Sequence, residues 1–220
     1  MIEGRRPIAS FASFAFQRGP LAYLRAMPAP AIAAAERDED LMLAYAAGDA
    51  AAFETLYARH KGGLYRYVLR QSANAGVAEE LFQDVWMNVM RARASYVPSA
   101  KFTTWLYRIA HNRVIDHWRT VGQVELVTAG VDGDEDPLDA IPAARNDEPD
   151  ARASGREIAN RLQAACAALP ALQREAFLLH QEGGLDLAEI SELTGAGVET
   201  VKSRIRYAVA KLRLELGDLQ

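Results

Sequence analysis

Residues 185–212 read LDLAEISELTGAGVETVKSRIRYAVAKL, and this stretch predicts a helix-turn-helix. Asp186 is a residue type that favours a helix N-cap, and Glu189, three positions later, completes a capping box. Gly195 and Gly197 then mark a short turn before a second run with helical periodicity. The stretch therefore predicts two helices with a tight turn between them, and the second helix is basic.

The second predicted helix separates apolar from polar side chains. Five apolar residues fall on one side of the helical wheel and are expected to pack inward: Val198, Val201, Ile205, Ala208 and Leu212. The other side carries Glu199, Lys202, Ser203 and Arg206. Lysine and arginine neutralise phosphates, and arginine can also donate two hydrogen bonds to guanine. The pattern favours DNA binding, although a basic helix face can also be an ordinary solvated surface.

The charge of the chain is unevenly distributed. Its net charge of -4 argues against a protein whose entire surface binds nucleic acid. Nine acidic residues lie between Glu125 and Asp150, where the only basic residue is Arg145 and prolines stand at 137, 142 and 149. We therefore expect residues 121–152 to form a flexible acidic linker. Its charge hides the more basic character of the segments on either side.

The remaining composition bounds the class of protein. The single cysteine, Cys166, excludes an intramolecular disulfide and indicates a reducing, cytoplasmic location. The four histidines are not spaced to gather on one helix face, so we expect no metal and no cofactor. No run of about 20 apolar residues is present, so no membrane contact by this chain is expected.

Residues 1–35 form an N-terminal extension that we leave out of the fold prediction. Arginines and phenylalanines there resemble a targeting peptide, but the apolar run is short and interrupted. Residues 2–5 spell a protease site used in engineered tags, and Met27 is an alternative start. Prolines at 7, 20, 28 and 30 favour disorder.

From residue 37 onward the apolar residues follow a helical period, which predicts an all-α protein of two small helical domains. Residues 36–120 are expected to form a four-helix bundle, with helices over 38–47, from 49 with a kink at Gly62-Gly63, over 77–93 and over 103–119. Residues 153–220 are expected to form the second domain, which ends with the helix-turn-helix. Its first helix reads to Leu169, and its next helix starts at Pro170 and ends at Gly183-Gly184.

The third predicted helix, residues 77–93, is apolar over more than one face. Two rows run along it: Leu81, Val85 and Val89 form the first, and Phe82 and Trp86 form the second. An outward row flanked by Gln83 and Asp84 is typical of a helix-to-helix protein interface. Burial of both rows in a crowded bundle is a comparable interpretation.

The fourth predicted helix and the loop before it combine aromatic and basic residues. Residues 96–119 read YVPSAKFTTWLYRIAHNRVIDHWR. Single-stranded nucleic acid is bound by such a mixture, because cations follow its backbone and rings stack on its bases. We expect Phe102, Trp105 and Leu106 to belong to the core. The polar set is expected to contact nucleic acid, with Asn112 on a base edge and Lys101, Arg108 and Arg113 on phosphates.

Three segments together resemble the extracytoplasmic-function group of bacterial sigma factors. They are ELFQDVW at 80–86, FTTWLYRIAHN at 102–112 and VETVKSR at 198–204, and they match in order and spacing. The resemblance extends from about Asp38 to Leu216, apart from the linker. It implies a two-domain subunit of RNA polymerase, with region 2 at 36–120 and region 4 at 153–220, that recognises promoters and performs no catalysis.

The resemblance also implies roles for particular residues. Docking on the polymerase core falls on Leu81, Gln83, Asp84, Val85 and Trp86. Capture of the melted minus-10 strand falls on the loop with Tyr96, Ser99 and Lys101 and on Asn112, next to the cations Arg108 and Arg113. Reading of the minus-35 duplex falls on Thr200, Lys202, Ser203, Arg204, Arg206 and Tyr207. The implied partners are core polymerase, promoter DNA and an anti-sigma factor.

Some positions depart from the family pattern. Glu199 and Tyr207 stand where similar proteins usually carry glycine and arginine, and residues 98–100 lack a common glycine. Glu199 suits the helix dipole but repels phosphate, so it is a candidate reader of cytosine. The acidic linker is either an imitation of nucleic acid or a plain spacer. The alternative function is a stand-alone helix-turn-helix regulator, whereas no arrangement of residues supports an enzyme.

Overall fold

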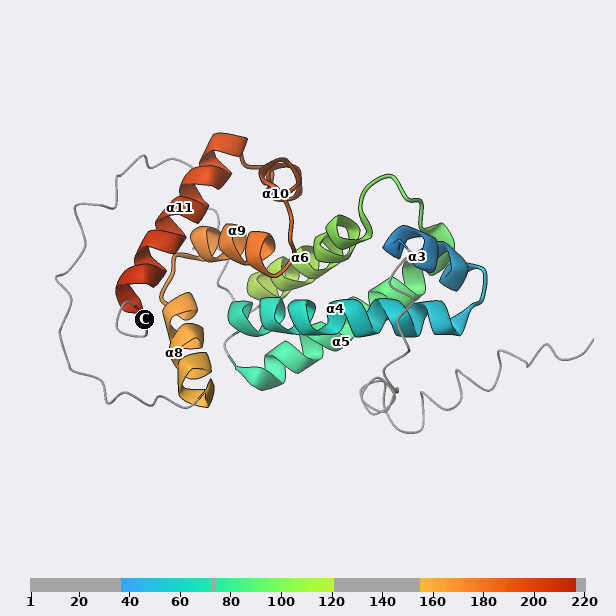
Figure 1. Cartoon of the computed structure of the whole chain (residues 1–220), viewed down its shortest axis with the longest axis horizontal. Helices are drawn as coiled ribbons and strands as arrows, with labels where there is room; N and C mark the ends of the chain where they lie inside the picture. Colours follow the sequence, from blue (N-terminus) through green and yellow to red (C-terminus); the bar gives the residue numbers. More distant parts are fainter. Residues whose placement is uncertain (1–36, 73, 121–154, 217–220) are drawn as a thin grey trace, which may run out of the picture.

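The structure is a computed structural model, and it describes residues 37–72, 74–120 and 155–216. Every regular element within these ranges is a helix, as the sequence predicts. The predictions for the N-terminal extension and for the acidic linker fall outside the described residues. Figure 1 shows the helices gathered into two adjoining groups.

The first group, here the N-terminal bundle, comprises residues 37–120. It contains α3 (Asp38–Ala46), α4 (Ala50–Gln71), α5 (Ala75–Ala92), a 3-10 turn (Arg93–Ser95) and α6 (Phe102–Thr120). The four predicted helices are confirmed, and their ends lie close to the predicted ones. Helix α4 is one helix of 22 residues that continues through Gly62 and Gly63, where the sequence predicts a kink.

The second group, here the C-terminal bundle, comprises residues 155–216. It contains α8 (Gly155–Ala167), α9 (Ala171–Gln181), α10 (Leu187–Thr194) and α11 (Val198–Glu215). The capping box of α10 is present: the Glu189 amide donates to the Asp186 carboxylate at 2.9 Å, and the Asp186 amide donates to the Glu189 carboxylate at 2.9 Å. Gly195 ends α10 with a φ of 71°, a left-handed conformation that glycine adopts without strain. The predicted helix-turn-helix is thus confirmed.

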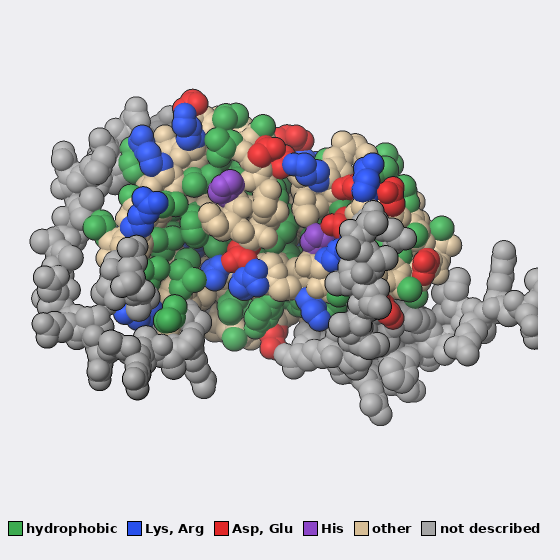
Figure 2. Space-filling model, in the orientation of Figure 1, with side chains coloured by type: hydrophobic (Ala, Val, Ile, Leu, Met, Phe, Trp, Pro, Cys, Tyr) green, Lys and Arg blue, Asp and Glu red, His purple; other side chains and the backbone are tan. Residues whose placement is uncertain are grey.

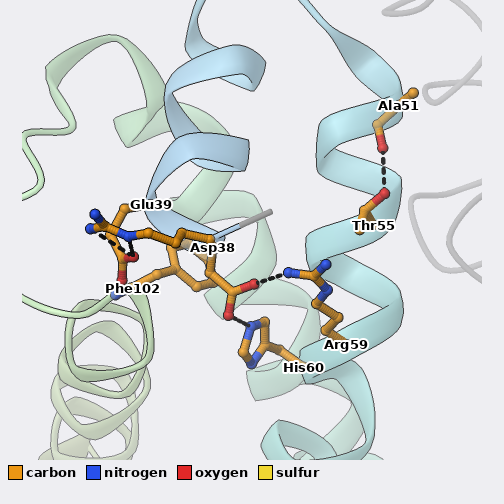
Figure 3. A network of polar contacts seen from close by, with 8 residues as sticks. Asp38, Glu39, Ala51, Thr55, Arg59, His60 and Phe102 are labelled. Carbon is orange, nitrogen blue, oxygen red and sulfur yellow. Dashed lines mark hydrogen bonds and ion pairs between the residues drawn. The ribbon is translucent and has the colours of Figure 1, made fainter. Parts of the chain in front are cut away.

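Helix α3 fixes the start of α6 (Figure 3). The Phe102 amide, at the first position of α6, donates a 2.7 Å hydrogen bond to the Glu39 carboxylate. Asp38 accepts a 2.6 Å hydrogen bond from Arg59 and lies 2.7 Å from the His60 ring nitrogen, both on α4. A carboxylate at a helix N-terminus satisfies amides that have no partner within the helix. The loop that precedes α6 therefore ends at a fixed point.

The two bundles share one hydrophobic core. The main cluster of buried residues contains Leu56, Leu64 and Leu106 of the N-terminal bundle together with Leu178 and Ile190 of the C-terminal bundle. A smaller cluster lies between α8 and α11 and contains Ala165, Cys166, Leu169, Ala208 and Leu212. The sequence predicts two domains on a flexible tether, and the packing of one against the other was not predicted.

Two burial predictions have clear outcomes. On α5 both apolar rows are buried, including Trp86 at 0% exposure, so the crowded-bundle interpretation is confirmed. On α11 Val201, Ala208 and Leu212 are buried as predicted. Val198 is 43% exposed, so its predicted inward packing is wrong. The reason is its place at the first position of α11, directly after the turn, where little of the bundle covers it.

Two further features concern the described part of the chain. None of its helices combines the length and the apolar character that crossing a bilayer requires. It also holds no group of three or more histidine, cysteine or acidic side chains placed to bind a metal.

Candidate nucleic-acid and protein interfaces

The exposed side of α11 carries most of the residues predicted to read duplex DNA. Thr200, Lys202 and Arg206 are exposed, and Ser203 and Tyr207 are half-buried beside them. Basic side chains follow α11 along one edge of the molecule (Figure 2). A helix that projects from a helix-turn-helix with such a face can enter the major groove.

Both exposed cations of this face, Lys202 and Arg206, contact a neighbouring side chain of α11. Lys202 Nζ lies 3.3 Å from the Glu199 carboxylate, one turn earlier on the helix. Arg206 donates a 3.1 Å hydrogen bond to the Tyr207 hydroxyl, and its guanidinium lies 4.9 Å from the centre of the Tyr207 ring. Tyr207 therefore orients Arg206.

Arg204 differs from its neighbours because it is half-buried and faces a carboxylate. Burial lowers the pKa of its guanidinium, while the nearby charge of Glu175 on α9 acts to raise the pKa. Arg204 is therefore less accessible than Lys202 and Arg206, which are exposed on the same helix.

The loop before α6 is divided between core and surface. Tyr96 is only 7% exposed, and its ring packs edge-on against Trp105 with centroids 4.9 Å apart. Burial, with the nearby charges of Glu39 and Asp38, raises the pKa of Tyr96 to about 12. The Tyr96 ring is therefore part of the core, and in this conformation it is not a stacking platform. Phe102 and Leu106 are buried as predicted, and Trp105 is half-buried against them.

The outer part of the same loop is open to ligands. Ser99 and Lys101 are exposed and help to line a pocket of about 330 Å³ with Arg37, Glu39, Pro98 and Ala100. A pocket of this size with mixed charges can hold a single base or a phosphate. Of the predicted loop residues, Ser99 and Lys101 keep an accessible position.

A second open pocket, of about 440 Å³, lies between α5 and α6. It is lined by the predicted residues Asn112 and Arg113, by Asp116 of the same helix, and by Asn88 and Arg91 of α5, which are not among the predicted residues. Arg91 Nη1 donates a 3.2 Å hydrogen bond to the Asn88 side chain. Asn88 and Arg91 are three residues apart, so both lie on one side of α5. This spacing is the signal that the sequence offered.

The cations Lys101 and Arg108 both face carboxylates of α10. Lys101 Nζ lies 3.1 Å from Glu189, and Arg108 donates a 2.7 Å hydrogen bond to Glu192. The hydrogen bond with Glu189 raises the pKa of Lys101. Acidic and basic side chains lie next to one another where α10 meets α6 (Figure 2). In this arrangement both predicted phosphate ligands already have anionic partners.

The predicted protein-docking residues on α5 fall into two sets. Leu81, Val85 and Trp86 are at most 2% exposed, so they form the buried side of the helix and cannot contact another protein directly in this conformation. Gln83 and Asp84 are partly exposed. Asp84 accepts two hydrogen bonds from Arg113 of α6. The accessible part of the predicted docking surface is therefore polar.

Two family profiles match the chain. The family described as Sigma-70 region 2 matches residues 56–123, which contain most of α4 and all of α5 and α6. The family described as Sigma-70, region 4 matches residues 159–212, which contain α9, α10 and most of α11. The first profile matches the N-terminal bundle from α4 onward and extends past its last residue, 120, to residue 123, and the second lies within the C-terminal bundle.

Curated relatives match over most of their length. RNA polymerase sigma factor CarQ of Myxococcus xanthus is 32% identical over 170 residues, which are 77% of this chain and 91% of that protein. ECF RNA polymerase sigma factor SigM of Mycobacterium tuberculosis is 31% identical over 83% of this chain and 86% of its own length. ECF RNA polymerase sigma factor SigK of Mycobacterium bovis is 34% identical over 80% of this chain and 92% of its own length.

Two solved structures have a similar fold. CnrH, in complex with the cytosolic domain of CnrY, is 23% identical with a TM-score of 0.59, over 83% of this chain and 98% of that one. The sigma factor RpoE of Bartonella quintana, in complex with the anti-sigma factor NepR, is 22% identical with a TM-score of 0.55, over 75% of this chain and 96% of that one. Both likenesses support the all-helical fold.

Proposed function

Since this chain belongs to the extracytoplasmic-function (ECF) family of RNA polymerase sigma factors, we propose that its two bundles divide promoter recognition between them. The chain is an alternative sigma factor, and we propose which of its residues contact promoter DNA and which contact core polymerase. The observations that support it best are the exposed basic side chains along α11 and a separate open groove between α5 and α6, lined by amides, guanidiniums and the carboxylate of Asp116.

The C-terminal bundle is proposed to read the minus-35 duplex with the exposed side of α11. Thr200, Lys202 and Arg206 are the direct contacts, since their side chains are exposed on one helix face. Ser203 and Tyr207 act at the edge of that face, and Arg204 supports it from the α9 side. Arg206, oriented by Tyr207, is the candidate for a bidentate contact with guanine.

The N-terminal bundle is proposed to hold the melted minus-10 strand along α6 and the preceding loop. Asn112 and Arg113 line the groove with Asn88 and Arg91, where amides can bind base edges and guanidiniums can bind phosphate. Ser99 and Lys101 line the loop pocket, and Arg108 projects from α6. The Tyr96 ring supports this loop from within the core.

Core polymerase is proposed to bind the partly exposed side of α5, at Gln83 and Asp84. Leu81, Val85 and Trp86 contribute by fixing α5 in the bundle, because their side chains are buried. A polar contact on a rigid helix suits an interaction that must be made and released in each round of initiation.

Further proposals follow from the family. The chain performs no catalysis, since polymerase supplies the chemistry, and it works in the cytoplasm with polymerase. An anti-sigma factor is proposed as a partner, because one of the similar solved structures is the sigma factor RpoE in complex with the anti-sigma factor NepR.

The test is reconstituted transcription. Purified chain and core polymerase from the same bacterium are incubated with a genomic fragment library, and transcript start sites are mapped. We expect a discrete subset of promoters that share two elements separated by a fixed spacing. Failure to bind core polymerase, combined with tight and specific binding of duplex DNA by the chain alone, would instead support a stand-alone regulator.

A further inference from the structure

The first turn of α11 faces solvent. Gly197, Val198, Glu199 and Thr200 are four consecutive exposed residues, and the buried side chain of Val201 anchors this turn in the bundle. In a helix-turn-helix, the residues at the start of the second helix reach base edges in the major groove. The side chains at 198–200 are therefore placed nearest to the bases of a duplex that α11 binds.

The turn before α11 holds these residues in a fixed orientation. The Ser191 hydroxyl donates a 2.7 Å hydrogen bond to the Ala196 carbonyl, and Gly195 ends α10 in the left-handed conformation. The N-cap residue of α11 is Gly197, which places no side chain beside the exposed residues. A side chain that reads a base from this turn is thus carried by a rigid element.

Glu199 lies on the side of α11 that is opposite to its buried residues. At 3.6 residues per turn it stands about 180° from Ala208 and about 200° from Val201, and both of these are buried. The Glu199 side chain is 84% exposed. Arg206, seven residues later, returns to the same side of the helix after nearly two turns. The carboxylate of Glu199 and the guanidinium of Arg206 are therefore presented to the same groove.

An acidic side chain at this place needs a hydrogen-bond donor on the DNA. Phosphates repel a carboxylate, and a carboxylate that loses water without gaining a donor is destabilised. The major groove offers two kinds of donor, the N4 amino group of cytosine and the N6 amino group of adenine. Adenine carries the N7 acceptor beside its amino group, which repels a carboxylate, whereas cytosine carries a C–H there. The chemistry of Glu199 therefore suits cytosine.

Lys202 compensates the charge of Glu199. Its Nζ lies 3.3 Å from Oε2 of Glu199, one turn earlier on the helix. A carboxylate has about four acceptor sites on its two oxygens, so this contact leaves room for a cytosine amino group. The Lys202 side chain is exposed and remains accessible to phosphate. The pair can thus approach the groove with little net charge, the carboxylate toward a base and the ammonium toward the backbone.

We propose that Glu199 is a specificity-determining residue of this chain, and that it accepts a hydrogen bond from the N4 amino group of a cytosine in the minus-35 element. A rise of 1.5 Å per residue separates Glu199 from Arg206 by about 10.5 Å along α11, or about three base-pair steps of 3.4 Å. Where α11 follows the groove, the recognised element contains a C·G pair about three base pairs from the guanine that Arg206 reads. The inference rests on the proposed reading of the minus-35 duplex by α11.

The experiment maps base preference with the holoenzyme. Core polymerase is combined with wild type, Glu199→Ala, Glu199→Gln or Glu215→Gln, and bound DNA is sequenced from a pool of promoters that differ only in the minus-35 element. Glu215 is an exposed acid at the other end of α11, so Glu215→Gln is the matched control and should select the wild-type element.

The two Glu199 variants are expected to change one position of the element. Glu199→Ala should lose about a tenfold preference for cytosine there, while the preferences at other positions persist. Glu199→Gln should shift the same position toward adenine, because an amide binds the N6 and N7 atoms of adenine together. A modified base isolates the hydrogen bond, since N4-methylcytosine replaces the amino hydrogen that faces the major groove. At the mapped position it should weaken wild-type binding about tenfold and leave binding by Glu199→Ala unchanged.

The other outcomes separate the inference from the proposed function. A uniform change in affinity in Glu199→Ala, with every base preference kept, would overturn the inference and leave Glu199 as a charge that only favours the helix dipole. Loss of a preference for a base other than cytosine, or an equal effect of N4-methylcytosine on Glu199→Ala, would overturn it as well. In each of these cases Arg206→Ala still changes a minus-35 preference. If Arg206→Ala also leaves every preference unchanged, the proposed reading by α11 itself is wrong.

Discussion

Arg113 of α6 donates two hydrogen bonds, from Nε at 2.9 Å and from Nη2 at 2.7 Å, to one carboxylate oxygen of Asp84 on α5. The proposed polymerase-docking surface and the proposed strand-binding groove therefore share an ion pair. Both side chains are about one-third exposed, so the pair itself adds little stability. If core polymerase binds Asp84 through a cation, we expect Arg113 to lose this partner and to become available to the DNA strand.

We expect Asp84→Arg to weaken binding to core polymerase by about 2 kcal/mol. The change removes the docking carboxylate and places a second cation beside Arg113. The measurement is a titration of labelled chain with core polymerase. Asp40→Arg, the same reversal at an exposed position of α3, is the control and should bind core normally. Normal binding by Asp84→Arg would move the docking site away from Asp84.

Arg206→Ala and Lys202→Ala are expected to affect the minus-35 element in different ways. Loss of a base contact at Arg206 costs about 1–3 kcal/mol and relaxes the preference at one base pair, whereas loss of a phosphate contact at Lys202 weakens binding uniformly and lowers its salt dependence. Holoenzyme binding to the promoter and to single-base variants measures both. Lys211→Ala, at the other end of α11, serves as the control. If Lys211→Ala weakened promoter binding equally, then binding by α11 would depend on general charge attraction rather than on contacts with particular bases.

Trp105→Ala tests whether this ring belongs to the core or to a base-stacking surface. Trp105 is half-buried and packs against Tyr96 and Phe102. We therefore expect the substitution to lower the free energy of unfolding by about 2–4 kcal/mol. Trp86→Ala, in a fully buried ring, should cost more. Denaturant unfolding of both variants gives the comparison. A stable Trp105→Ala that fails only in promoter opening would make the ring a stacking platform.

Local patterns were enough to predict the helices and the helix-turn-helix. The capping box of Asp186 and Glu189 and the left-handed Gly195 depend on residues within one turn, so the sequence displays them directly. On α5 the apolar periodicity predicted the helix itself, but it could not decide between an exposed and a buried second row. Crowding by α4 and α6, with Trp86 against Phe53 and Tyr57, decided it.

The packing of the two bundles could not be predicted from the sequence. The partners of Glu182, Arg66 and Arg70, stand more than a hundred residues before it, across the acidic linker. A surface carboxylate looks the same in a sequence whether it faces water or a cation, so Glu189 and Glu192 carried no signal. Gly63 did carry one, but a glycine in a helix suggests a kink before it suggests a close approach by another helix.

The acid stability of the chain should depend on Asp38, which joins α3 to α4. Burial acts to raise the pKa of Asp38, but hydrogen bonds and charges from His60 and Arg59 outweigh it and hold the pKa below the ordinary value of 3.8. A carboxyl whose folded pKa is lowered stabilises the fold above its unfolded pKa, and this contribution is lost as pH falls through the folded pKa. We therefore expect Asp38→Asn to lower the free energy of unfolding at neutral pH. The difference from wild type should shrink as pH falls below about 4, where the wild-type carboxyl also becomes neutral.

Urea unfolding at several pH values measures this difference, with Asp40→Asn on the same helix as the control. A difference between Asp38→Asn and wild type that stayed constant down to the acid range would assign the effect to lost packing rather than to the charge of Asp38.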